Sequence, residues 1–187
     1  MSFRTLLARF RRADTGVAAV EFAMILPVML LIYLGSVEAS ALISMDRRVQ
    51  SISGAVGDLV ARSNTAITAA TLTDYFQAAQ GIMAPHSADP VTQVVTAVSV
   101  AADGQSAKVL WSRQYVDRKY AVGVQYRANQ SFTLPDALLD LAKNNTVIVS
   151  EASFSYLPLR GLVFHATVPL HRVTYYLPRF EGGIQIR

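Results

Sequence analysis

A run of apolar residues that begins at residue 17 is long enough to cross a membrane, and it limits what this chain can fold into. No charged residue occurs between Phe22 and Val37, and residues 17–20 extend the apolar stretch upstream. Together with the small or apolar residues up to Ser44, the run can cross a ~30 Å hydrocarbon core as a helix. We therefore expect a single-pass membrane segment followed by one modest domain.

One carboxylate, Glu21, interrupts this run near its N-terminal end. An ionisable group inside a membrane segment disfavours insertion by roughly 2.5–3.5 kcal/mol, so it usually marks a site with a partner. Gly16 lies five residues before it. Cleavage after Gly16 would create an amine on Val17 about one helical turn from Glu21. In a low-dielectric helix bundle, a carboxylate and an ammonium group are tolerated best as a pair.

The positive charge of the chain belongs to its N-terminal end. The net charge is +4, but residues 1–16 alone contribute +3, from Arg4, Arg9, Arg11 and Arg12 against Asp14. Basic residues on that side of the segment place the N-terminus in the cytoplasm. We predict a cytoplasmic basic leader over 1–16, a transmembrane helix over 17–45, a helix extension over 46–62 and an extracytoplasmic domain over 63–187.

Three further residues bear on how the membrane helix packs. Pro27 frees a backbone carbonyl and usually bends a helix. Gly35, four residues before Ala39, allows another helix to approach closely, although ordinary membrane composition explains this pair nearly as well. Glu38 lies close to the outer boundary of the membrane, where a charge is tolerated, and its role stays open.

Two other interpretations of this N-terminus remain open. A secretory signal peptide places its small cleavage residues after the apolar core, whereas Gly16 precedes the core. An uncleaved signal anchor, with Glu21 reaching the cytoplasmic headgroups, explains the position of the charges. It leaves the spacing between Gly16 and Glu21 unexplained.

The junction at Gly16 and Glu21, with Phe22, Pro27 and the segment 35–38, resembles the N-terminus of TadE-like minor pilins and pseudopilins of the tight-adherence (Tad, or Flp) pilus, which are type IVb pilin-like. The resemblance implies cleavage by a prepilin peptidase between Gly16 and Val17. It implies that Glu21 neutralises the terminal amine of a neighbouring subunit. It also implies an inner-membrane location, with other pilins, minor pilins and the inner-membrane assembly platform as partners.

Beyond the membrane, apolar residues at spacings of four and three predict that the helix continues and packs on the chain's own sheet: Met45, Val49, Ile52, Val56 and Leu59. It should end near residues 62–65. Short helices are predicted over 72–83, capped by Thr71 or Thr73, and over 134–141.

β-rich runs at 92–100 and 108–115 predict a hairpin. Further strands are expected over 146–156 and over 161–176, the latter interrupted by Pro169. The predicted fold class is thus α+β: a long N-terminal transmembrane helix that continues into a small, pilin-like domain with an antiparallel sheet of about four strands. Core candidates are Trp111, Phe132, Phe154 and Phe164. The segment 175–180 is expected to be an exposed subunit contact.

The sequence contains no recognisable catalytic or metal-binding motif. It has no cysteine, and His86, His165 and His171 lack the spacing of a zinc site. We therefore expect a structural protein with no catalytic residues, no metal and no cofactor; a membrane-tethered periplasmic hydrolase is the enzyme-class alternative. A solvated strand face, rather than binding of nucleic acid, is expected for the basic residues Arg113, Arg118, Lys119 and Arg127.

Overall fold

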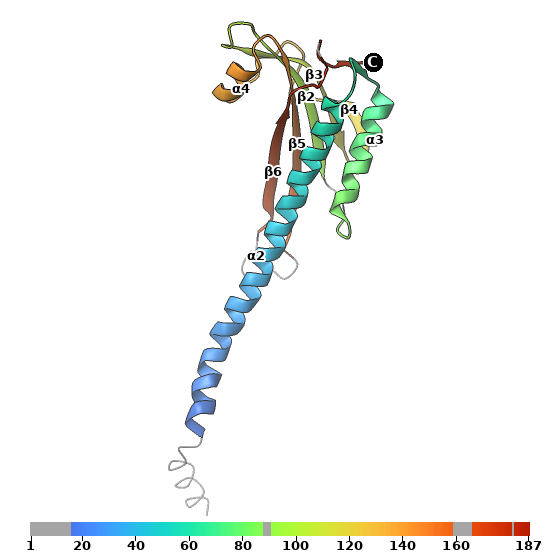
Figure 1. Cartoon of the computed structure of the whole chain (residues 1–187). Coiled ribbons are helices and arrows are strands. Elements are labelled where there is room, and N and C mark those ends of the chain that lie inside the picture. Colours follow the sequence, from blue (N-terminus) through green and yellow to red (C-terminus); the bar gives the residue numbers. More distant parts are fainter. Residues whose placement is uncertain (1–15, 88–90, 159–165, 181) are drawn as a thin grey trace, which may run out of the picture.

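One uninterrupted helix dominates the computed structural model, which describes residues 16–87, 91–158, 166–180 and 182–187. Helix α2 (Val17–Ala61) is 45 residues long and contains Pro27 without ending there. The sheet and the other helices pack against one side of its upper half, and its lower half projects as a free stem (Figure 1). The helix ends at Arg62, whose backbone N–H bonds the carbonyl of Asp58, so the predicted end is confirmed.

A five-stranded antiparallel sheet with the strand order β4-β3-β2-β5-β6 is the central sheet of the domain. Its strands are β2 (Thr92–Val100), β3 (Ala107–Val116), β4 (Lys119–Val122), β5 (Thr146–Tyr156) and β6 (Val168–Tyr176). The predicted α+β class is confirmed, with β4 as a strand that was not expected. Pro169 lies within β6 instead of interrupting it, because an edge strand tolerates proline; residues 161–165 of that predicted strand lie outside the described residues.

The upper half of α2 covers one face of the sheet, mainly along β5 and β6 (Figure 1). Val49, Ile52 and Val56 are fully buried there, as predicted. At the end of the apolar face, Val60 is buried in place of Leu59. A helix with 3.6 residues per turn drifts away from an alternating four-three repeat, which moves the contact by one position.

Polar and glycine contacts fix the helix on the sheet. Ser53 Oγ donates a hydrogen bond to the carbonyl of Ser150 at 2.7 Å. The ring of Tyr176 lies so close to Gly57 that a Cβ atom there would be 2.6 Å from it. Near the membrane stem, Arg172 of β6 donates through Nε to Asp46 at 2.8 Å and makes a second bond through Nη2. Strand β6 is therefore attached to α2 along its length.

Helix α3 (Ala69–Gln80), continued by the 3₁₀ helix η2 (Gly81–Met83), packs beside α2. The predicted apolar stripe is buried: Leu72, Phe76, Ala79 and Met83. The predicted start at 72 and caps are wrong, because Thr68 Oγ1 accepts from the N–H of Thr71 and begins the helix at Ala69. Arg48 of α2 donates to the carbonyls of Ile82 and Ala84, which fastens η2 to the upper half of α2.

The opposite face of the sheet holds a second, smaller core under helix α4 (Asp136–Leu141), which begins two positions later than predicted. A parallel pair, β1 (Ala66–Ile67) with β7 (Gln185–Ile186), ties the C-terminus to the chain just after α2. Trp111 is buried, as predicted, and its Nε1 donates to the carbonyl of Ile184 at 2.6 Å. The other predicted core residues are less buried: Phe154 is partly buried against the main core and Phe132 against the smaller one. Phe164 lies outside the described residues.

Candidate functional site: the lower half of helix α2

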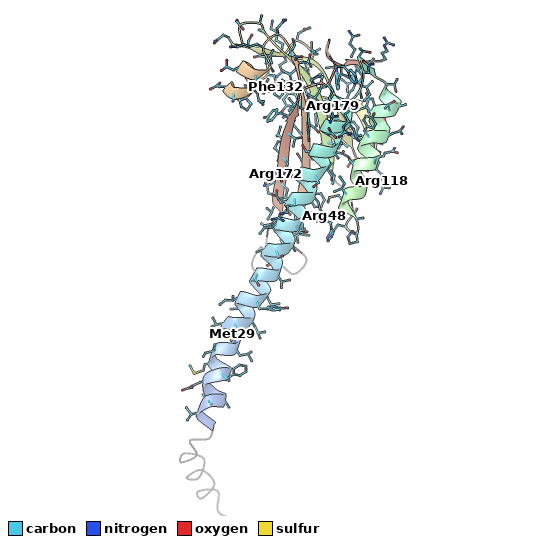
Figure 2. The ribbon with its side chains drawn as sticks, viewed as in Figure 1. Met29, Arg48, Arg118, Phe132, Arg172 and Arg179 are labelled. Carbon is cyan, nitrogen blue, oxygen red and sulfur yellow. The ribbon has the colours of Figure 1, made fainter. Side chains whose placement is uncertain are left out.

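The lower half of α2, from Val17 to Val37, has no buried residue. Its most apolar 18-residue stretch is wholly uncovered by the domain, and Met29 in Figure 2 projects from this bare part of the stem. At about 1.5 Å per residue the stretch is roughly 30 Å long, which matches the hydrocarbon core of a bilayer. An apolar surface of this size is stable only against lipid or another apolar helix. Helix α2 is therefore a single-pass membrane anchor.

Gly16 lies immediately before α2, and nothing in the described chain requires a glycine there. Its backbone angles, φ −97° and ψ −10°, are open to any residue. A Cβ atom at this position would have no other atom within 4 Å. Val17, the first residue of the helix, is 51% exposed. Both residues next to the predicted cleavage site are thus accessible, and packing within the described residues would tolerate a side chain at position 16.

Glu21 and Phe22 lie on the first turns of the same helix, and both are exposed. Glu21 is one helical turn above Val17, because the two are four residues apart. Within the described part of the chain, no side chain or backbone group pairs with the Glu21 carboxylate. The structure therefore places the predicted residues Gly16, Val17, Glu21 and Phe22 together at the start of the helix, with the carboxylate exposed.

The other predicted residues of the stem mark its upper end. Pro27 lies inside the helix, about two turns above Glu21. Gly35 is half-buried, and Glu38 is buried, with 8% of its surface exposed. Glu38 is the first residue of α2 that the fold buries, so it marks the place where the membrane stem meets the domain.

A polar cluster that sequence reasoning missed lies on the sheet face opposite α2. Glu151 of β5 is buried, and its Oε2 is 3.5 Å from Nε2 of His171 on β6. His171 Nδ1 is 2.8 Å from Ser153 Oγ, its direct cross-strand partner. Burial raises the pKa of Glu151, and the Tyr126 hydroxyl and His171 partly oppose this rise. The one signal in the sequence was an acidic residue within the β-rich run 146–156.

Burial and the nearby carboxylate raise the pKa of Tyr126 to about 12, so its hydroxyl stays protonated at neutral pH. Within the described residues, no group of three or more acidic or histidine side chains is placed to hold a metal ion. Of the basic residues predicted to form a solvated face, Arg118, Lys119 and Arg127 are exposed on or near β4, whereas Arg113 of β3 is half-buried and donates to the carbonyl of Ser112. In the segment 175–180, Tyr175, Leu177 and Phe180 are exposed, whereas Tyr176 packs on α2.

Comparison with known proteins adds one finding to this geometry. Residues 16–55 match the family model described as TadE-like protein. The chain matches none of the curated proteins and none of the solved structures. The matched stretch begins at Gly16 and includes all of the uncovered stem and the first buried turns above it.

Proposed function

We propose that this chain, whose residues 16–55 match the TadE-like family, is a minor pilin or pseudopilin of a Tad pilus that is cleaved after Gly16 and takes part in pilus assembly. The resemblance predicted from the sequence is confirmed by that match. The cleavage and the role in assembly are our proposal. A prepilin peptidase would remove the basic leader, and the mature chain would begin at Val17.

The observation that carries this proposal is the spacing of an unconstrained glycine, Gly16, and an exposed carboxylate, Glu21, for which the described residues supply no partner. Gly16 has open space where a side chain would lie, which suits recognition by a peptidase. Glu21 lies exposed one turn above Val17 in a membrane segment. Cleavage would supply the missing cation as the amine of Val17, either within the same helix or in a neighbouring subunit.

The proposal includes a topology and a set of partners. The basic leader would lie in the cytoplasm and the domain in the periplasm, with α2 in the bacterial inner membrane. The proposed partners are the prepilin peptidase, other pilins and minor pilins, the inner-membrane assembly platform and the lipid bilayer. Nucleic acid is not among them, because almost all of the net charge is in the leader that cleavage would remove.

Determination of the mature N-terminus tests the proposal. The full chain is produced with a Tad prepilin peptidase, extracted from membranes and sequenced from its N-terminus. Val17 as the first residue is the expected result. Met1 or Ser2 would instead indicate the second interpretation, an uncleaved bitopic protein that anchors another envelope component. The control is Gly16→Leu, which the open space at this position accommodates without disturbing the fold and which should stay uncleaved.

We also propose that the chain is not an enzyme. The arrangement nearest to a catalytic one is Ser153, His171 and Glu151, and strand register accounts for it: Ser153 and His171 are directly opposed on β5 and β6. Such cross-strand pairs contribute roughly 0.2–1 kcal/mol to a sheet. Ester hydrolysis by the full chain that Ser153→Ala abolishes would contradict this interpretation and favour a membrane-tethered hydrolase.

A further inference from the structure

The free side of strand β3 has a gap next to the end of β4. At one end of the gap, the N–H of Gly123 donates to the carbonyl of Ser112 at 3.0 Å, and at the other end the N–H of Asn129 donates to the carbonyl of Val109 at 2.8 Å. Residues 124–128, which the structure describes in full, add no backbone hydrogen bond to the strand between these two contacts. The gap is about two residues long, or roughly 7 Å at 3.3 Å per residue, so it admits a side chain of a partner but not an added strand.

This gap opens into a cavity of about 360 Å³, which we call the β3 notch. Leu110 and Val122 line it and are exposed apolar residues, with 46% and 64% of their surfaces accessible. Trp111 and Ile186 supply further apolar wall. The volume is at the lower end of the range for ligand sites, which suits one apolar side chain with its flanking backbone.

The walls of the notch are held in place by the fold. Nε1 of Trp111 donates to the carbonyl of Ile184 at 2.6 Å, and the indole ring is buried. Gly123 passes so close to Ser112 that a Cβ atom at position 123 would clash with the serine side chain. A site of fixed shape loses little conformational entropy on binding, so the notch is already formed for a ligand.

The charge around the notch is one-sided. Arg113, which is half-buried, and Arg127, which is exposed, line it, and none of the described residues that line it is acidic. Among the described residues, no carboxylate forms an ion pair with either guanidinium group. The segment 107–128 has five basic residues and one acidic residue, a net charge of +4, whereas residues 17–187 as a whole have +1, so the rest of them have −3. Such a local excess of positive charge attracts an acidic partner.

Two features decide which kind of acidic partner fits the notch. Strands β3 and β4 lie in the part of the domain away from the stem (Figure 1), so lipid headgroups do not reach the notch. Its exposed apolar rim favours a protein segment over a nucleic acid, because protein interfaces combine a buried apolar anchor with charged groups around it.

We propose that the β3 notch binds an acidic segment of a partner protein. One apolar side chain of the segment enters the notch past Leu110 and Val122 and packs on Trp111. Carboxylates on either side of this anchor pair with Arg113 and Arg127. This interaction is additional to the proposed role of the stem and does not require cleavage after residue 16, so either proposal can fail without the other.

A fluorescence titration tests this inference, because Trp111 is the one tryptophan of the chain and lines the notch. The full chain in detergent is titrated with acetylated and amidated pentapeptides that have two acidic residues on each side of a central leucine, valine, phenylalanine or glycine. A matched set has asparagine and glutamine in place of the acidic residues. The expected result is a saturable change with at least one apolar acidic peptide, and about tenfold weaker binding when either the carboxylates or the apolar side chain is removed.

Two substitutions at exposed positions of the lining locate the binding. Arg127→Gln and Val122→Asp should each weaken binding of the apolar acidic peptide about tenfold, and neither should disturb folding, because both side chains are exposed. The matched control is Lys108→Gln, which removes the same charge from an exposed position of β3 outside the lining. It should change the affinity by less than about twofold, because the charge is screened by salt over about 8–10 Å.

Four outcomes would overturn the proposal. The first is the absence of a saturable change with every acidic peptide, and the second is equal binding of the peptides with central glycine. The third is a single-stranded oligodeoxynucleotide that binds as tightly as the best peptide and is weakened by Arg127→Gln, which would indicate a nucleic-acid site. The fourth is the same fluorescence change when the chain alone is concentrated, which would indicate a second copy as the occupant.

Discussion

The two halves of helix α2 have the same backbone geometry and opposite surroundings. Between Val17 and Val37 the helix is apolar on every side apart from Glu21 near its start, and none of it is buried. Between Met45 and Ala61 it has one buried apolar face, and charged side chains such as Arg47 and Asp58 lie elsewhere. The helix thus passes from lipid into a protein core without interruption. A uniformly apolar sequence corresponds to the first environment, and a 3.6-residue period corresponds to the second.

Different interactions determine what each half of the helix packs against. In lipid, apolar side chains gain little by meeting another helix, so close packing and polar groups decide which helices associate. In the domain, burial of apolar surface supplies the stabilisation, and shape decides the fit. We therefore expect a substitution in the lower half to change association and one in the upper half to change folding.

The largest effect is expected for Glu21→Ala, which should insert as well as the wild-type chain or better, because a charge has been removed from the membrane segment. It should lose co-purification with other pilins, because no carboxylate remains to pair with a terminal amine. The measurement is the yield of cross-linked pilins from membranes, with membrane content of the variant measured in parallel.

Glu21→Gln is the matched control for charge, since it keeps the size and the hydrogen-bonding oxygen of the side chain. If charge pairing is the cause, the glutamine variant should fail as the alanine variant does. Wild-type recovery of pilins with either variant would contradict the role assigned to Glu21 and would leave the fold of the domain unaffected.

Two isoleucines of the same helix sharpen the comparison further. Ile52 is fully buried, whereas Ile32 is 68% exposed on the stem. Ile52→Ala should lower the free energy of unfolding of the domain by about 2–5 kcal/mol, through lost burial and a cavity. Ile32→Ala should change it very little. Fluorescence of Trp111, the one tryptophan of the chain, follows unfolding of the domain by denaturant in detergent; equal losses in the two variants would show that the stem also packs on the domain.

The elements that could be predicted are those with a strong local pattern. Strands β2 and β5 have the predicted bounds, because runs of β-branched residues over 92–100 and 146–156 end in clear turn residues. The burial of Met45 through Val56 follows directly from helical spacing. In the same way, a glycine five residues before a carboxylate, Gly16 and Glu21, was visible in the sequence as a candidate site.

The elements that could not be predicted depend on unusual turns or on distant pairing. Strand β4 follows a tight turn in which Asp117 and Arg118 have φ of 48° and 59°. Such turns favour Asn-Gly or Asp-Gly, so a turn with arginine gives no sequence signal. The pair β1 and β7 joins residues 66–67 to 185–186, and two residues are too few to form a pattern.

The site shows the same division between local and long-range information. The predicted residues 16–22 are neighbours in the chain and need no tertiary structure to come together. Glu151 is buried on β5 between strands β2 and β6, which are distant in sequence, and the sequence contains no pattern that reports such burial. Only the packed domain reveals that a second carboxylate, on the sheet, is withdrawn from water.

The smallest effect is expected for Glu151→Gln, which should change how stability depends on pH. Glu151 is a buried carboxylate of the domain, whereas Glu21 is an exposed carboxylate of the stem. Burial raises the folded-state pKa of Glu151 above its ordinary value of 4.5, against the opposing influence of Tyr126 and His171. The folded state therefore binds this proton more tightly than the unfolded state does. Its contribution to stability is complete below pH 4.5 and is lost as the pH rises through the folded-state pKa.

Glutamine cannot ionise, so the variant should not lose this contribution. The difference in melting temperature between Glu151→Gln and the wild-type chain should become more favourable to the variant as the pH rises from 4 to 8, measured by circular dichroism of the full chain in detergent. Tyr126, whose pKa is about 12, remains a donor throughout this range. The control is Asp74→Asn, which removes an exposed carboxyl from α3. A difference that does not vary with pH would show that Glu151 is as well stabilised in its charged form in the sheet as in water.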